Sequence, residues 1–322
     1  MKMGNSTRLR DGLARATFAP TMSYAGIDLG GTKLAAAAFS PEGEILHRES
    51  VLLAGKEGAD VGGLIADVIR RLADEHGCVA TGVCVPGLYR SAKGTVWAPN
   101  IPGWDDYPLL AELSGAVPGY HNVTIDSDRA AYILGETWKG SASGASDAIF
   151  IAVGTGIGAG VLAGGQIVRG HGDVAGAIGW LALDRPYNER YKQHGCFEDQ
   201  ASGPGLVRVA NDLGFMTDGQ TTTASIFDAF DRGDEIATRV IDNAIELWGM
   251  AAANLVSIFN PEMIVFGGGI FGPAAKFIDR IAREARRWAQ PIAIEQVKFV
   301  TSSLGSEAGL YGAARLGMIQ ST

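Results

Sequence analysis

A short turn of glycine and threonine between two apolar runs occurs twice in this chain. The first copy reads Tyr24-Ala-Gly-Ile-Asp-Leu-Gly-Gly-Thr-Lys33 and continues into the apolar run 34–39. The second copy, 148–168, repeats the order of apolar strand, Gly/Thr turn and apolar strand. In both copies another turn and a third strand follow. Because the copies lie about 125 residues apart, they predict a duplicated α/β unit whose turns face each other across a cleft.

The residues of the first turn are suited to binding phosphate. Gly30 and Gly31 let the backbone approach a bulky anion, because glycine has no Cβ and tolerates unusual backbone angles. Thr32 adds a hydroxyl, and the Asp28 carboxylate can meet a phosphate-bound magnesium ion through water. The Walker A pattern GxxxxGK[ST] is absent. A plain β-hairpin with a glycine turn is the alternative for this copy taken alone.

Composition excludes several classes of function. With 322 residues, 47% of them hydrophobic and 19% charged, the chain is typical of a globular protein of about two domains. Its net charge of −8, without a basic stripe, argues against a nucleic-acid partner. No apolar run has the length of a membrane span. The cysteines Cys78, Cys84 and Cys196 are odd in number and unpatterned, so we predict a cytoplasmic protein without a membrane partner.

Polar residues follow three further segments. A predicted strand ends at Pro86-Gly87, and a loop rich in Pro, Gly and Trp contains Asn100. This loop is either a plain surface loop or a wall of a small-molecule pocket in which Asn100 forms hydrogen bonds. The strand 122–126 leads into Asp128 and a helix. Asp128 is therefore either a helix first-turn carboxylate or a general base at the carboxyl end of a strand.

Together these motifs resemble the ROK family of sugar kinases, over residues 24–318. The matching segments, in the order and spacing of that family, are Asp28-x-Gly30-Gly31-Thr32-Lys33, Pro86-Gly87, Pro99-Asn100-x-x-Gly103-Trp104, Ser127-Asp128 with Glu136, Gly154-Thr155-Gly156-x-Gly158-x-Gly160, Phe266-Gly-Gly-Gly269 and Glu307-Ala-Gly-x-x-Gly-Ala-Ala314. The resemblance implies an α/β protein with a duplicated, actin-like and ribonuclease-H-like fold, in which two domains flank a central cleft. It also implies an enzyme of carbohydrate metabolism, a kinase that transfers a phosphoryl group from ATP to a sugar hydroxyl.

Carried over residue by residue, the resemblance assigns two groups of site residues. The nucleotide, with the magnesium ion that accompanies ATP, would be bound by Asp28, Gly30, Gly31, Thr32, Lys33, Gly154, Thr155, Gly156, Gly268 and Gly269. The acceptor would be bound by Gly87, Asn100 and Glu198, with Asp128 as the catalytic base. The family also implies a homodimer.

The chain departs from the family pattern in the acceptor pocket. The family usually reads Ala-Gly-Glu-Ile-Gly-His where this chain reads Ala175-Gly-Ala-Ile-Gly-Trp180. The glutamate that contacts the sugar is thus Ala177, and the histidine that sugar and zinc share is Trp180. We expect Trp180 either to stack on an apolar ring face of the substrate or to fill volume.

The zinc motif of the family is also incomplete. Of C-x-C-G-x-x-G-C-x-E, only Gly195, Cys196 and Glu198 remain. A closed zinc site takes four soft or imidazole ligands, which this set does not supply. We therefore predict no structural zinc, and we interpret His194 and Cys196 as packing or surface residues.

The changed pocket predicts an unusual acceptor. Each hydroxyl of a hexose left unpaired when buried costs about 1–3 kcal/mol. We expect a deoxy, amino or N-acyl sugar, or a cyclitol, rather than glucose. The sequence leaves open which hydroxyl is phosphorylated and whether another donor replaces ATP. Two other interpretations are a sugar-sensing protein that has lost catalysis and an actin- or Hsp70-like ATPase.

The duplicated unit and the family resemblance also predict domain boundaries. We expect a disordered leader over 1–23, a smaller α/β domain over 24–138 and a larger one over 139–305. A closing helix over 306–318 is expected to pack back onto the first domain.

Overall fold

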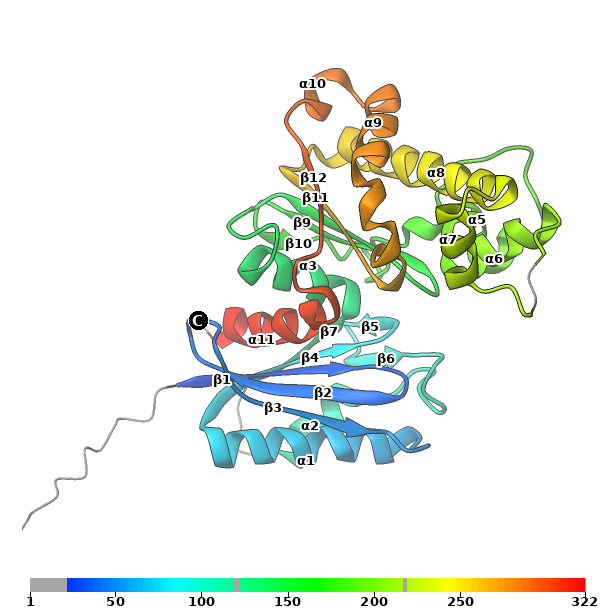
Figure 1. Cartoon of the computed structure of the whole chain (residues 1–322). Coiled ribbons are helices and arrows are strands. Elements are labelled where there is room, and N and C mark those ends of the chain that lie inside the picture. The colour runs from blue at the N-terminus through cyan, green and yellow to red at the C-terminus, as the bar shows by residue number, and fades with distance from the viewer. Residues whose placement is uncertain (1–21, 118–121, 217–218, 322) are drawn as a thin grey trace, which may run out of the picture.

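The computed structural model describes residues 22–117, 122–216 and 219–321. Two five-stranded sheets form its framework, with strand orders β3-β2-β1-β4-β7 and β10-β9-β8-β11-β12 (Figure 1). In each sheet three antiparallel strands continue into two parallel ones. The predicted duplication is therefore present. Most of the predicted leader lies outside the described residues, and the domain boundaries stay a prediction.

The strands of the two sheets have similar lengths. The first sheet contains β1 (Ser23–Leu29), β2 (Lys33–Phe39), β3 (Ile45–Leu52), β4 (Cys78–Val85) and β7 (Val123–Ser127). The second contains β8 (Ala148–Val153), β9 (Ile157–Ala163), β10 (Gln166–Ile167), β11 (Met263–Gly267) and β12 (Lys298–Thr301). A separate hairpin joins β5 (Leu88–Arg90) to β6 (Thr95–Trp97).

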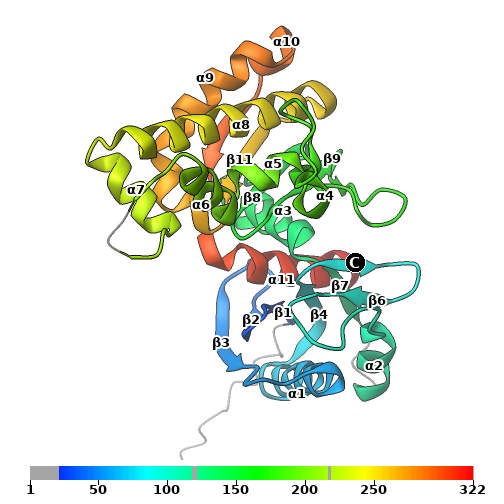
Figure 2. The same cartoon turned by 90° about the vertical axis from the view of Figure 1, so that its right-hand side faces the viewer.

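Helices cover both faces of the sheets (Figures 1 and 2). The α-helices are α1 (Gly58–His76), α2 (Leu109–Ala116), α3 (Asp128–Lys139), α4 (Tyr191–His194), α5 (Cys196–Ala201), α6 (Gly203–Asp212), α7 (Thr223–Asp231), α8 (Glu235–Phe259), α9 (Ile278–Trp288), α10 (Pro291–Ile294) and α11 (Ala308–Ser321). Short 3-10 helices are η1 (Ile178–Trp180), η2 (Gly269–Phe271), η3 (Pro273–Phe277) and η4 (Gly305–Glu307). None of the described helices has an apolar stretch long enough to cross a bilayer.

Helix α1 shows how the sequence pattern produces the outer layer of the first sheet. Its apolar side chains recur at helical spacing and are buried in one core cluster with the sheet, among them Val61, Ile65 and Leu72. Gly77 ends the helix with a φ of 66°, a left-handed conformation that favours glycine. The chain then enters the buried parallel strand β4.

Helices α3 and α11 lie between the two sheets (Figure 1). They approach closely through small residues: a Cβ on Gly312 would lie 1.7 Å from the carbonyl oxygen of Ala131. A Cβ on Gly82 of β4 would lie 1.8 Å from the carbonyl oxygen of Ala313. On its other side α3 meets the second sheet, where a Cβ on Gly160 would lie 2.0 Å from the carbonyl oxygen of Arg129. The first turn of α3 is thereby fixed at the junction of the two halves.

Candidate active site

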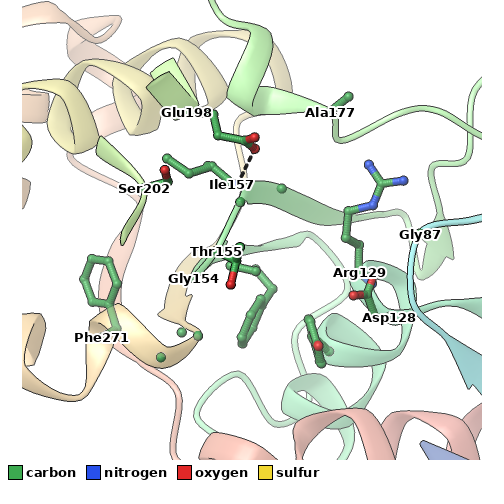
Figure 3. Close-up of a pocket in the computed structure, with 18 of the residues that line it drawn as sticks. Gly87, Asp128, Arg129, Gly154, Thr155, Ile157, Ala177, Glu198, Ser202 and Phe271 are labelled. Atoms are coloured by element: carbon green, nitrogen blue, oxygen red, sulfur yellow. Dashed lines mark hydrogen bonds between the residues drawn. The ribbon is translucent and has the colours of Figure 1, made fainter. Parts of the chain in front are cut away.

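A cavity of about 1330 Å³ lies at this junction. The first half of the chain contributes Asp28, Gly87, Asn100 and Asp128 to its lining. The second half contributes the turn Gly154-Thr155-Gly156, the side chain of Glu198 and the glycines Gly268 and Gly269. Figure 3 shows Asp128, Thr155 and Glu198 around this space. Segments far apart in the sequence thus meet in one pocket.

Asp128 stands at the carboxyl end of β7 and begins α3. Ser127 caps this helix by accepting a 3.5 Å hydrogen bond from the N–H of Ala130, so its hydroxyl, not Asp128, occupies the N-cap. Asp128 Oδ1 accepts a 2.8 Å hydrogen bond from the N–H of Arg129. Burial raises the pKa of the Asp128 carboxyl to about 6, with the Arg129 charge lowering it and Asp28 raising it. Asp128 is therefore a first-turn carboxylate that also lines the pocket, and its role as a general base stays a prediction.

Asp28 lies near the end of β1 and lines the same cavity as Asp128. Burial raises the pKa of its carboxyl, although a hydrogen bond with Cys84 and the charge of Lys33 lower it. Only glycine fits opposite it, because a Cβ on Gly309 would lie 2.5 Å from Asp28 Oδ2. The close approach of α11 therefore holds this carboxylate at the pocket wall.

The turn between β8 and β9 is connected directly to Glu198. The N–H of Ile157 donates a 2.7 Å hydrogen bond to Glu198 Oε2. Gly156 leaves room for that carboxylate, since a Cβ there would lie 2.9 Å from Oε2. Burial raises the pKa of Glu198, and the bond from Ile157 and the nearby His194 lower it. Glu198 can therefore contact a bound molecule and at the same time stabilise the turn.

The first Gly/Thr turn does not line the large cavity. The N–H of Gly30 donates a 2.9 Å hydrogen bond to the carbonyl of Lys33, as in a tight hairpin. Gly31 and Thr32 instead line a neighbouring cavity of about 380 Å³. Asn100 lines both cavities, so its side chain stands between the two turns. Gly30 and Lys33 line neither cavity in the described structure.

The predicted acceptor residues Gly87, Asn100, Glu198 and Trp180 all line the large cavity. Gly87 has a φ of 89°, and a Cβ there would lie 2.3 Å from the carbonyl oxygen of Trp97. Trp180 is 57% exposed, so its ring borders open space and does not fill a closed volume. Ala177 lines the pocket beside it and offers only a methyl group.

The remnant of the zinc motif lies next to Glu198. His194 is exposed, with Nδ1 3.9 Å from Glu198 Oε1, whereas Cys196 is buried. Among the residues that the structure describes, no group of three or more His, Cys, Asp or Glu side chains is arranged to hold a metal ion. That this protein needs no zinc stays a prediction.

Sequence reasoning missed several lining residues, chiefly Arg129, Ser202 and Phe271. Arg129 follows Asp128 directly, and its place in the first turn of a helix at a strand end was the available signal. Ser202 and Phe271 had no comparable signal, because they follow segments whose path over the pocket depends on the packing of the second half.

Comparison with known proteins gives the family that the sequence motifs resemble, over a stretch that includes the residues of the pocket. The ROK family profile matches residues 24–318. A glucokinase of Halalkalibacterium halodurans is 32% identical over 311 residues, which cover 90% of this chain and 93% of that protein. The ROK hexokinase structure from Thermus thermophilus has a TM-score of 0.82 at 31% identity, covering 93% of this chain and 99% of that one.

A ligand complex is also among the similar structures. The ROK family glucokinase of Streptomyces griseus, in complex with glucose and AMPPNP, has a TM-score of 0.70 at 28% identity. The match covers 92% of this chain and 99% of that one. The predicted fold, an actin-like α/β duplication with two domains, is confirmed by these structures.

Proposed function

This chain belongs to the ROK family, and we propose that it transfers the γ-phosphoryl group of ATP to a hydroxyl of a sugar or sugar-like acceptor, with Asp128 as the base. That it is a sugar kinase follows from the family and from the relatives it resembles. The observation that carries the role of Asp128 is its position. It is a half-buried carboxylate in the cavity that the turn at Gly154 also lines.

Phosphoryl transfer passes through a loose transition state, so the protein mainly positions the reactants and stabilises charge. The exposed turn at Thr155 and Gly156 offers N–H groups and a hydroxyl to the phosphates. Gly268 and Gly269 leave open backbone for the nucleoside at the same cavity. These groups would hold ATP at the second half of the chain.

The pocket also offers a place for the magnesium ion that accompanies ATP. Asp28 is a carboxylate at the cavity wall, and oxygen ligands are those that Mg²⁺ prefers. Its carboxylate would hold the ion through water, and the ion would neutralise phosphate charge. The single carboxylate of Asp28 suits a magnesium ion that is bound mainly by the phosphates of the nucleotide.

Asp128 would accept the proton of the attacking hydroxyl. Its raised pKa of about 6 suits this task, because a base works best when its pKa is near the working pH. Asn100 and Glu198 would orient the acceptor ring beside it. The chain needs both an ionised Asp128 and a fixed hydroxyl for transfer to compete with hydrolysis.

The first Gly/Thr turn can reach the phosphates of ATP only after a conformational change. Gly31 and Thr32 lie in the neighbouring cavity, across Asn100 from the large one. We propose that the two halves close when both substrates bind, so that this turn reaches the phosphates and water is expelled.

The finer proposal concerns the acceptor. At these two positions the pocket offers few hydrogen-bonding groups, because Ala177 has only a methyl group and Trp180 only its indole N–H. We propose an acceptor other than glucose: a deoxy, amino or N-acyl sugar, or a cyclitol. An unpaired buried hydroxyl costs about 1–3 kcal/mol, which disfavours a fully hydroxylated hexose.

A coupled assay of ADP release with a panel of acceptors tests both the kinase function and the proposed class of acceptor. Acceptor-dependent ADP release supports the kinase, whereas ATP hydrolysis without any acceptor would favour an ATPase. A protein that binds sugars without turnover would be a sensor. Within an active panel, glucose ranking first by kcat/KM would overturn the proposal of an unusual acceptor.

A further inference from the structure

The guanidinium of Arg129 is a charged group of the pocket, and its charge lowers the pKa of the neighbouring Asp128 carboxyl. Arg129 lines the large cavity, and among the described residues its guanidinium forms no ion pair with a carboxylate. The other arginine of this cavity differs: Arg208 pairs with the buried carboxylate of Asp199. Arg129 is thus a cation that the protein itself leaves available.

The path of the side chain is fixed by the backbone of β9. A Cβ on Gly158 would lie 2.7 Å from Arg129 Cδ, so only glycine there lets the side chain cross the strand. The carbonyl oxygen of Gly176 would lie 3.7 Å from that same Cβ. The Arg129 side chain and the segment that leads to Ala177 therefore both pass beside Gly158.

The guanidinium faces the acceptor end of the pocket. In Figure 3 it points away from the Asp128 carboxylate and from the turn at Thr155, toward the part of the pocket where Ala177 lies. Phe271, by contrast, lies at the opposite end with the glycines after β11. An anion bound by Arg129 would consequently belong to the acceptor and not to the nucleotide.

The surroundings of the guanidinium do not satisfy its charge. The cavity lining includes the apolar side chains of Leu88, Val174 and Ala177. Among the described residues, none of the carboxylates that line it, Asp28, Asp128, Glu198 and Asp199, forms an ion pair with Arg129. A guanidinium withdrawn from water costs free energy unless it is paired, and its planar N–H donors fit carboxylate or phosphate oxygens in pairs. The missing partner is thus best supplied by the ligand.

We propose that the acceptor carries an anionic substituent, a carboxylate or a phosphate, which Arg129 binds. The substrate class is then an acidic sugar or acidic cyclitol, and Arg129 is the residue that selects it. This inference rests on the proposed kinase function, and it adds a negatively charged substituent to the acceptor proposed above.

The test compares neutral and acidic acceptors with the wild-type protein and the Arg129→Gln variant. The panel pairs neutral hexoses and N-acyl hexosamines with the matching uronates, aldonates and hexose monophosphates, which separates the carboxylate from the phosphate source. We expect the wild type to favour an acidic member by about tenfold or more in kcat/KM, since a charged pair is lost with the neutral one. Arg129→Gln should raise KM for that acceptor by about tenfold or more and leave KM for ATP within about twofold.

The control is Arg70→Gln, on the exposed face of α1, which should change neither constant. A wild type that phosphorylates neutral sugars better than every acidic one overturns the inference and leaves the kinase function standing. An Arg129→Gln variant with raised KM for ATP, or with equal losses on neutral and acidic acceptors, also overturns it, because the guanidinium would then serve the transferred phosphoryl group. If no acceptor is turned over, the kinase function fails. In that case isothermal titration calorimetry measures whether the acidic acceptors of the panel bind to the protein. If none of them binds, the inference is overturned as well.

Discussion

Asp128 combines a structural and a chemical requirement in one side chain. Its carboxyl begins a helix, where a negative charge is favoured, yet burial raises its pKa from 3.8 to about 6. The raised pKa means that folding favours the protonated form. The stability it contributes is present below pH 3.8 and is lost as the pH rises through about 6. The residue thus keeps its charge at neutral pH at some expense in stability, as sites of proton transfer commonly do.

The pH dependence of turnover follows from this pKa. Below pH 6 the Asp128 carboxyl is protonated and cannot accept the proton of the acceptor. We expect kcat/KM for the acceptor to fall about tenfold per pH unit on the acid side and to level off above pH 7. Initial rates between pH 4.5 and 8.5, with circular dichroism to confirm folding at each pH, would measure this. A rate that stays flat down to pH 5 would contradict the assignment.

At the residue scale the predicted site residues divide into two groups, and the role of each stays a prediction. Asp28, Gly87, Asn100, Asp128 and Glu198 line one cavity, whereas residues 30–33 of the first turn do not. Arg129 was not predicted, although its place directly after Asp128 was visible in the sequence. That it forms no ion pair among the described residues becomes visible only when β9 is placed beside it.

At the element scale the site depends on how closely α3 and α11 pack against each other. The contact consists of backbone: a Cβ on Gly312 would meet the carbonyl of Ala131 at 1.7 Å. No side-chain movement relieves such an overlap, so the helices must separate. Asp28 lies on β1 and Asp128 lies at the start of α3, so the positions of both carboxylates depend on this packing.

Substituting Gly312 tests this packing. We expect Gly312→Ala to destabilise the protein by about 1–3 kcal/mol or more, because overpacking against backbone forces the elements apart. Gly63→Ala is the matched control in α1, where nothing lies within 4 Å of an added Cβ. It should stabilise by about 0.5–1 kcal/mol, since alanine favours a helix. Urea unfolding measures both, and equal effects of the two substitutions would contradict the packing described.

The helices were predicted from their apolar spacing with uneven success. The apolar spacing over 234–260 predicts one long amphipathic helix, and the structure has α8 there, with Asp234 as N-cap and Asn260 as C-cap. The pattern over 273–289, with Pro273 in its first turn, predicts a single helix, but the structure has the 3-10 helix η3 followed by α9. Phe277, at the break, is buried against the rings of Phe227 and Phe230. Such a tertiary contact leaves no mark in helical periodicity.

At the scale of the whole molecule the two halves are joined by polar contacts beside the pocket. Arg169, after β10, pairs with the buried Asp126 of β7. Ser91 donates a 2.9 Å hydrogen bond from Oγ to the carboxylate of Asp173. Duplication could be predicted from the repeated turns, but the separation of the first turn from the large cavity could not, since it depends on how the halves meet. The homodimer stays a prediction.

The most direct test of the account is the turnover of Asp128→Asn. Asparagine keeps the shape of the side chain but cannot take a proton. With an acceptor that the wild type phosphorylates, we expect kcat to fall by about 10²–10⁴-fold. The variant should unfold at the same temperature as the wild type or a higher one, because the buried charge is gone. A variant that retains an appreciable fraction of wild-type ADP release at saturating acceptor would contradict the role of Asp128 as the base.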